Sequence, residues 1–176
     1  DIHIPRRFNL AGALIARRLD AGDGDRLAYR DPDRDWTFGE TAAGAARVAH
    51  ALAALGVRRD ERVLIALPDS AGFVAAFLGT LLAGAVAVPC NTFLGPADYR
   101  YFLDESRAVA AITTSAIREA LATALEAAPT LRAVLVTDAD DDAGLTRAWR
   151  RWVDAAPADL APADTHRDAA AFWLWT

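Results

Sequence analysis

The segment DERVLIALPDSAGFVAAFLG, residues 60–79, indicates the fold of this chain. Its run Val63–Leu67 is continuously apolar, which is typical of a strand covered on both faces. The turn-forming residues 68–70 follow, and after them apolar side chains recur at helical spacing. That apolar stripe consists of Phe73, Phe77, Leu78, Leu81 and Leu82. The segment therefore predicts a buried strand followed by a helix.

The alternation of strand and helix continues toward the carboxyl end. Short apolar runs predict strands at 86–88, 110–113 and 133–136. Between them, Gly95-Pro96 and Ser115 mark the starts of two helices. Strands separated by helices of this length imply right-handed crossovers and a parallel sheet. The expected fold class is α/β, a Rossmann-like parallel sheet flanked by helices.

The amino-terminal side predicts a small β-hairpin between two helices. Asn9 is the expected N-cap of the first helix, which ends at Ala21-Gly22. The hairpin pairs 27–30 with 36–37 across a turn of Asp and Pro residues. Residues 37–40, Thr-Phe-Gly-Glu, match a capping box that begins the next helix, and Gly56 supplies its left-handed stop.

The remaining residues are less regular. Asp138–Asp142 form an acidic loop, and Leu145, Trp149 and Trp152 stand at helical spacing. Residues 155–166 indicate an irregular connection, and the apolar run 171–175 predicts a strand. Because a buried strand is an unusual last element, we expect the chain to be a fragment.

We expect residues 1–176 to form one part of a larger domain. Its segments are the hairpin and helices (1–60), the strand–helix layer (61–137), the loop, helix and connection (138–170) and the final strand (171–176).

Composition excludes several classes of protein. The 176 residues are 53% hydrophobic and carry a net charge of −5, which argues against nucleic acid as a partner. All 19 basic residues are arginines, so a Schiff base or a phosphate site centred on lysine is excluded within this chain. Glycines and Pro89 interrupt the longest apolar stretch, 71–90, which argues against a membrane span.

The compartment is inferred from two further features. The single cysteine, Cys90, excludes an internal disulfide framework and fits a reducing compartment. The chain begins at Asp1, and no charged and then apolar leader opens it, so a secretory signal is absent or already removed. We therefore expect a cytoplasmic protein.

Ser70 is the first candidate for chemistry. Its strand–turn–helix setting, with Gly72 two residues on, resembles a nucleophile elbow. Pro68 occupies the position of the first glycine, however, and the three histidines, His3, His50 and His166, are far apart in the sequence, none with an obvious acid partner. Ser70 is therefore better interpreted as the N-cap of the following helix.

Other candidates also have simpler interpretations. Gly22-Asp23-Gly24 resembles part of a dinucleotide fingerprint but follows a helix, so we expect a turn. Asp138 and Asp140–Asp142 could bind a hard cation, but the spacing of a calcium loop is missing. Cys90 follows a strand's carboxyl end with no visible base or cation beside it, so we expect a small buried hydrophobe.

Four tryptophans, finally, could stack on a base or on an aromatic acid. They are Trp149, Trp152, Trp173 and Trp175. Their helix and strand spacing favours packing in the core. The residues alone assemble no complete catalytic set and no metal site.

Several segments together resemble the beginning of the acyl-adenylate-forming enzymes, which include acyl- and aryl-CoA synthetases, luciferases and peptide-synthetase adenylation domains. Residues 36–40, WTFGE, resemble the family's x-T-Y-x-E-L, with Thr41 where Leu is common. Residues 60–79 resemble its G-D-R-V … P-N-S-x-E-F-V-x-A-F-L. Residues 82–91, LAGAVAVPCN, are similar to K-A-G-A-V-x-V-P-x-N, with Leu82 replacing Lys.

Within that family, two segments resemble benzoate-CoA and hydroxybenzoate-CoA ligases. Residues 91–108 are similar to their N-T-L-L-x-x-x-D-Y-x-Y-x-L-x-x-S-R-A. Residues 172–176, FWLWT, resemble F-W-L-Y-S/T, which in those enzymes runs into a Gly/Ser/Thr phosphate loop; Trp175 replaces Tyr.

The resemblance implies an AMP-forming ligase that uses ATP, Mg²⁺ and CoA to convert an aromatic carboxylate, through an acyl-adenylate, into a thioester. It places the acyl pocket and the catalytic lysine later in the family's chain. Thr176, as the first phosphate-loop residue, is therefore the one expected ligand-binding position. We expect this chain alone to be inactive, to bind no cofactor tightly, and to self-associate or dimerise through an exposed apolar face.

Two alternatives remain open at this stage. One is an adenylation domain that passes an amino acid to a carrier protein, in which case an acidic pocket residue faces the substrate amine. The other is a stand-alone α/β interaction module, which a gene ending at Thr176 would favour.

Overall fold

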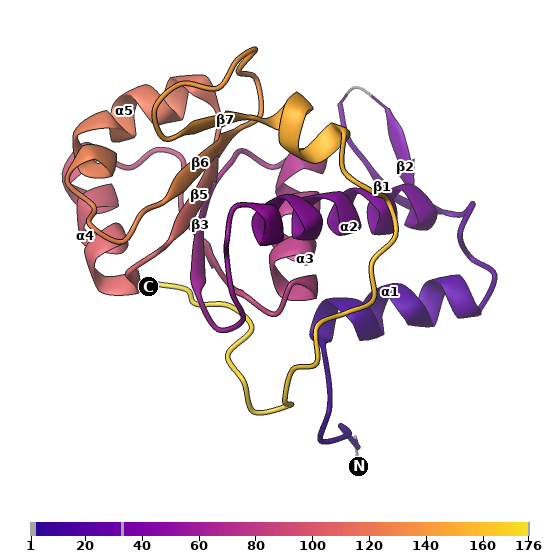
Figure 1. Cartoon of the computed structure of the whole chain (residues 1–176). Helices are drawn as coiled ribbons and strands as arrows, with labels where there is room; N and C mark the ends of the chain where they lie inside the picture. Colours follow the sequence, from indigo (N-terminus) through magenta and orange to yellow (C-terminus); the bar gives the residue numbers. More distant parts are fainter. Residues whose placement is uncertain (1–2, 33, 176) are drawn as a thin grey trace.

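A five-stranded parallel sheet lies at the centre of the computed structural model, which describes residues 3–32 and 34–175 (Figure 1). Its strand order is β4-β3-β5-β6-β7, and β1 and β2 form a separate antiparallel hairpin. The strands are β1 (Leu27–Arg30), β2 (Asp35–Thr37), β3 (Arg62–Ala66), β4 (Val86–Pro89), β5 (Ala110–Thr113), β6 (Ala133–Val136) and β7 (Thr146–Ala148). The α/β class with a parallel sheet and a small hairpin is confirmed.

The described residues also form five α-helices and one short π-helix. They are α1 (Leu10–Asp20), α2 (Phe38–Ala54), α3 (Ala71–Leu82), α4 (Pro96–Ser106), α5 (Ser115–Glu126) and η1 (Arg150–Asp154). In Figure 1, α4 and α5 cover one face of the sheet, and α2 and α3 cover the other with α1 outside them. No helix in the described ranges is both long enough and apolar enough to cross a membrane.

The inner strand β3, which lies between β4 and β5, separates two hydrophobic cores. Val63 and Ile65 pack in the core under α1, α2 and α3. Leu64, between them in sequence, packs in the core under α4 and α5. All three are fully buried, because successive side chains of a strand point to opposite faces. The strand predicted to be covered on both faces is therefore confirmed.

Helices α2 and α3 approach each other closely at Gly79. A Cβ atom at this position would lie 2.6 Å from the Ala45 carbonyl oxygen and 2.6 Å from the Val48 Cβ. No such atom fits there, so glycine is what lets the two helices share one layer.

The predicted N-cap residues are confirmed at the starts of three helices. Thr37 Oγ1 accepts from the Glu40 amide at 3.2 Å, and the Glu40 carboxylate accepts from the Thr37 amide at 2.9 Å. The Asn9 and Ser70 side chains cap α1 and α3 by accepting from the Gly12 and Phe73 amides. The prediction for Ser115 is wrong, because Thr114 caps α5 by accepting from the Ile117 amide, and Ser115 is the first helical residue.

Two elements near the carboxyl end differ from expectation. The helix predicted over 145–152 is wrong, because residues 146–148 extend the sheet as β7 beside β6 and only η1 is helical. The backbone groups at the free edge of β6 need hydrogen-bond partners. Residues 146–148 supply them by pairing as a strand, although their apolar spacing favoured a helix. The strand predicted over 171–175 is reduced to one parallel bridge, between Ala87 and Phe172.

Two glycines of α3 provide a test of the close helix contact. We expect Gly79→Ala to lower the free energy of unfolding by about 1–3 kcal/mol, because its methyl group forces α2 and α3 apart. Gly72→Ala is the matched control: its Cβ would meet nothing closer than 3.6 Å, so it should stabilise by about 0.4–1 kcal/mol. Urea denaturation of both variants measures this. Equal effects of the two substitutions would contradict the packing described.

The capping box gives a second test. Thr37→Ala removes the acceptor for the Glu40 amide and should cost about 1 kcal/mol of unfolding free energy. Thr123, exposed in the last turn of α5, is the control, and Thr123→Ala should stay within about 0.5 kcal/mol. Thermal denaturation followed by circular dichroism compares the two. A loss at Thr123 as large as that at Thr37 would refute the capping role.

Candidate functional site

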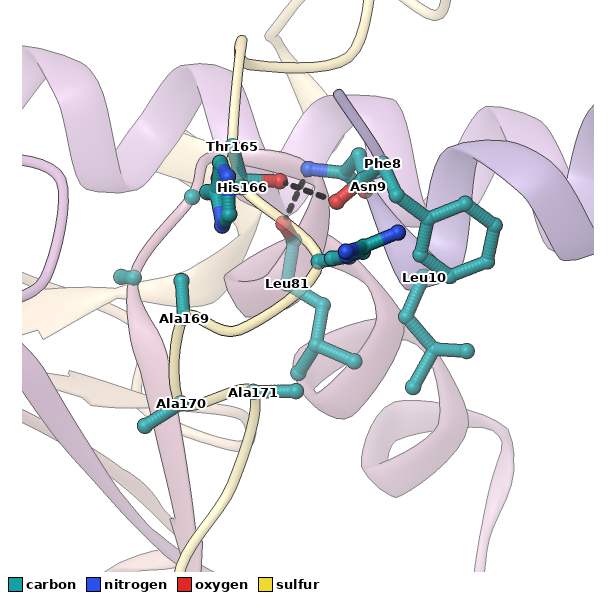
Figure 2. A pocket seen from close by; sticks show the side chains of 12 residues that line it. Phe8, Asn9, Leu10, Leu81, Thr165, His166, Ala169, Ala170 and Ala171 are labelled. Carbon is teal, nitrogen blue, oxygen red and sulfur yellow. Dashed lines mark hydrogen bonds between the residues drawn. The ribbon is translucent and has the colours of Figure 1, made fainter. Parts of the chain in front are cut away.

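The segment that leads to Thr176 is tied to the amino-terminal end of the chain. The Phe8 amide donates to the Thr165 carbonyl at 2.9 Å, and the Thr165 hydroxyl donates to the Phe8 carbonyl at 2.8 Å. The Asn9 side-chain amide donates to the Leu81 carbonyl at 2.8 Å (Figure 2). It also donates to the Ala163 carbonyl at 3.3 Å. The connection after η1 is irregular, as predicted, but hydrogen bonds hold it against α1 and α3.

A small cavity lies in this junction, between the amino-terminal residues, the end of α3 and the final segment (Figure 2). Its volume is about 130 Å³, below the 300–1,000 Å³ of typical small-molecule sites. Alanines 169–171 and Leu81 form much of its wall. The geometry indicates a joint between segments rather than a catalytic centre.

Beyond this junction the chain runs along the outer edge of β4. The Ala87 amide donates to the Ala171 carbonyl at 3.0 Å, and the Trp173 amide donates to the Ala87 carbonyl at 2.9 Å. On one side of the sheet, the Phe172 ring lies 5.6 Å from that of Phe77 in α3. These contacts fix the position and direction of the chain just before Thr176, which lies outside the described residues.

The tryptophans of this segment have different surroundings. Trp175 is partly buried, and its ring centroid lies 4.7 Å from that of Phe102 in α4. Trp173 is 37% exposed, with the Arg62 guanidinium 5.7 Å from its ring. Core packing is confirmed for Trp175 and, on the other face, for Trp149 and Trp152. It is wrong for Trp173, whose ring lies at the surface against Trp175 and Arg62 and belongs to neither core.

An exposed apolar surface surrounds this edge. We call it the β4 edge surface, and it consists of Phe93, Tyr101, Phe172, Trp173 and Leu174. Phe93, in the loop after β4, is 95% exposed, and Leu174 is 65% exposed. Several large apolar side chains exposed near one strand edge are typical of sites where another segment or protein packs.

Ser70 and the histidines do not form a catalytic set. The Ser70 hydroxyl accepts from the Phe73 amide at 3.2 Å and donates to the Pro68 carbonyl at 2.9 Å, so its role as an N-cap is confirmed. The His50 ring contacts the Asp159 carbonyl at 2.8 Å. The expectation that no histidine has an acid partner is wrong for His166, which lies 3.3 Å from Asp168, although both side chains are on the surface.

The acidic candidates serve the local fold. Asp23, in the Gly22–Gly24 turn, accepts from Arg26 at 2.9 Å, and this hydrogen bond lowers the pKa of its carboxyl. Asp142 accepts from the Trp152 indole at 2.9 Å and from the Ala148 amide at 2.8 Å, which lowers its pKa as well. Within the described ranges, no three His, Cys, Asp or Glu side chains are grouped to hold a metal ion.

Cys90 is partly buried against the core under α4 and α5. Its thiol donates to the Val88 carbonyl at 3.6 Å, and burial raises its pKa to about 12. A thiol with this pKa is not a nucleophile at neutral pH. The sequence interpretation of a small hydrophobe agrees with these surroundings.

Sequence reasoning missed a larger cavity of about 470 Å³ beside the hairpin. Arg47 of α2, Trp36 of β2 and Gly72 of α3 are among the residues that line it. They are far apart in the sequence and form no motif, so only the packing of the hairpin against α2 and α3 shows that they share one cavity.

Comparisons with known proteins identify the family. A family model described as AMP-binding enzyme matches residues 16–176. A benzoate–CoA ligase of Thauera aromatica is 34% identical over 99% of this chain and 33% of its own length. A 4-hydroxybenzoate–CoA/benzoate–CoA ligase of Rhodopseudomonas palustris is 31% identical over 97% of this chain and 31% of its own. The chain thus spans about a third of these relatives.

Solved structures agree with this result. The anthranilate CoA ligase AuaEII, in complex with anthranoyl-AMP, superposes with a TM-score of 0.89 and 30% identity over 96% of this chain and 32% of its own. A benzoate CoA ligase from Burkholderia xenovorans gives a TM-score of 0.83 and 38% identity over 95% of this chain and 32% of its own. The match to the family model covers most of the sequence, and the chain therefore belongs to the AMP-binding enzyme family.

Proposed function

We propose that this chain is the amino-terminal part of an AMP-forming aryl-CoA ligase. Such an enzyme converts ATP, an aromatic carboxylate and CoA into an aryl-CoA thioester, AMP and pyrophosphate. The observation that carries the proposal is the similarity of almost the entire chain, in sequence and in fold, to ligases of benzoate and its hydroxy and amino derivatives.

In this proposal the chain is a scaffold that positions a phosphate loop. The backbone hydrogen bonds of Ala87 to Ala171 and Trp173 hold the final segment against β4. Packing of Trp175 on Phe102 then directs the chain toward Thr176, which we propose to be the first residue of that loop. Because these contacts depend on the sheet, the sheet would fix where the loop begins.

The cofactors of the proposed enzyme are ATP, Mg²⁺ and CoA. ATP supplies a leaving group for the carboxylate oxygen, and cationic groups stabilise the phosphate charge as it develops. The sequence contains no lysine, and the described residues hold no metal cluster. The triphosphate and the metal would therefore be held by residues outside this chain, apart from Thr176, and we propose no catalytic or metal-binding residue within it.

We also propose a cytoplasmic location, with a small aromatic carboxylate as the substrate and with no nucleic-acid or membrane partner. The net charge of −5 supports this proposal, because nucleic acids and anionic membranes attract basic surfaces. The single cysteine fits a reducing compartment.

Isotope exchange between ATP and pyrophosphate tests the function. We expect the translation product that contains this chain to catalyse exchange when benzoate or a hydroxybenzoate is added, and the 176 residues alone to give no exchange above a protein-free control. Exchange that depends on an amino acid instead would overturn the aryl-CoA assignment. Exchange by the 176 residues at the rate of an intact ligase would overturn the scaffold role.

The β4 edge surface gives a further test. We propose that the rest of the enzyme covers it, and we expect the 176-residue chain to self-associate through it because it exposes large apolar side chains. Phe93→Ser combined with Leu174→Ser should shift sedimentation velocity profiles toward the monomer. Leu14, 53% exposed on α1, is the control, and Leu14→Ser should change nothing. At about 100 μM protein, self-association with a dissociation constant near 1 mM is already detectable. A wild-type chain that remains monomeric at this concentration would contradict the proposal.

A further inference from the structure

The cavity of about 470 Å³ beside the hairpin has no role in the proposed function. It lies between the β1–β2 hairpin, α2 and the beginning of α3. Gly72 is the second residue of α3, the helix that follows β3, and Thr137 follows β6 directly. The cavity is therefore next to the carboxyl ends of parallel strands, where sheets of this kind bind ligands.

The walls of the cavity are largely aromatic and apolar. The rings of Tyr29 and Trp36 lie nearly parallel, with centroids 6.3 Å apart and planes 12° apart. Trp149, Val153 and Ala75 contribute further apolar surface. Burial raises the pKa of Tyr29, so its phenol is neutral at physiological pH. Flat walls of this kind favour a planar ring.

Two hydrogen-bond donors of the cavity residues have no partner. Arg47 Nε and Trp36 Nε1 are buried, and neither donates to any atom of the described residues. Both groups are donors only. Buried polar groups are nearly always satisfied in proteins, so this pair requires an acceptor that the described part of the chain does not supply.

The other charged groups of the lining are Arg34, Glu40 and Asp154. Arg34 stacks over Trp36 at 3.5 Å and pairs with Glu40 at 2.6 Å. Glu40 also accepts from the Thr37 amide, so its charge is already neutralised. Asp154 is exposed to solvent. Arg47 is therefore the cation whose charge is left for a ligand.

We propose that this cavity binds a small, planar aromatic carboxylate. The ring lies against Trp36 and Trp149, and the carboxylate accepts hydrogen bonds from Arg47 and from the Trp36 indole. A charged acceptor satisfies both buried donors, and an arginine–carboxylate contact is among the stronger hydrogen bonds in proteins. This site is separate from the one at which the proposed ligase would activate its acid, and the inference does not rest on that function.

Equilibrium dialysis of the 176-residue chain against radiolabelled benzoate tests the site. The cavity beside the hairpin combines aromatic walls with two unpaired donors, so we expect saturable binding of about one benzoate per chain. Dialysis does not require a monomer, so self-association leaves the measurement interpretable. Binding that stays linear up to about 10 mM benzoate, above the millimolar limit of weak complexes, would overturn the proposal.

Matched variants locate the binding. We expect Arg47→Gln to weaken it by at least about tenfold, the loss of one charge-assisted hydrogen bond. Arg17→Gln removes the same charge from the exposed face of α1 and should leave affinity unchanged. Trp36→Phe keeps the ring and removes the indole donor, so we expect a smaller loss. Near-UV circular dichroism checks that each variant is folded.

A substitution that fills the cavity gives an independent readout if Arg47→Gln is misfolded. A Cβ at Gly72 would meet only Ser70 Oγ at 3.6 Å and Thr137 Cγ2 at 3.9 Å, so the side chain of Gly72→Leu has room to enter the cavity and block it. Gly95→Leu, also at a helix start and with its nearest contact at 3.7 Å, is the control. Benzoate binding unchanged in the folded Gly72→Leu variant would overturn the proposal.

Competing ligands test the chemical class. Cyclohexanecarboxylate has the same charge without a planar ring, and benzylamine has the ring with the opposite charge. We expect the first to compete with benzoate more weakly than unlabelled benzoate does, and the second not to compete. Competition by benzylamine as strong as that by benzoate would refute the carboxylate assignment. An absence of ATP–pyrophosphate exchange in the longer protein would contradict the proposed ligase function and would leave the proposal for this cavity unaffected.

Discussion

The double burial of β3 is the constraint on which the other elements depend. Residues 63–66 point alternately into two separate cores, and both cores exclude solvent from them completely. A strand in this position has to carry helices on both sides of the sheet, since either face left open would expose valine, leucine or isoleucine to water. The chain meets this requirement with α2 and α3 on one face and α4 and α5 on the other.

This arrangement determines where the functional features lie. Because β4 lies at one edge of the sheet, its outer side has free backbone groups, and the final segment is added there through the Ala87 backbone. The exposed aromatic side chains around it follow from the same topology. The hairpin, in contrast, lies on the α2–α3 side, where it encloses the cavity lined by Arg47. The two features are thus independent results of one layered fold.

Much of this fold could be predicted from local chemistry. The run Val63–Leu67, the capping box at Thr37 and the caps at Asn9 and Ser70 depend on neighbouring residues, and each is present in the structure. The errors concern elements set by distant partners. Residues 146–148 became a strand because β6 had a free edge, and Trp173 remains partly exposed because only Trp175 and Arg62 pack against its ring.

The sites differ in the same way. Resemblance to a known family pointed to the end of the chain, since that inference needs only a conserved order of residues along the sequence. No such order connects Trp36, Arg47 and Gly72, which meet only after the hairpin, α2 and α3 have packed. The sequence raised Cys90 and the acidic loop as candidate functional residues and then set them aside. In the structure they form hydrogen bonds with residues close in sequence, Cys90 with Val88 and Asp142 with Ala148, and so serve the local fold.

The Asn9 side chain joins three parts of the chain whose synthesis is widely separated in time. It accepts from Gly12, donates to Leu81, and donates to Ala163, which is 154 residues away. On a ribosome that adds about 5–20 residues per second, the last of these partners emerges many seconds after the first. The Asn9 side chain therefore lacks its hydrogen bond to Ala163 until almost all of the 176 residues have been synthesised. A nascent chain stalled before Ala163 would leave the amino-terminal segment exposed to proteases.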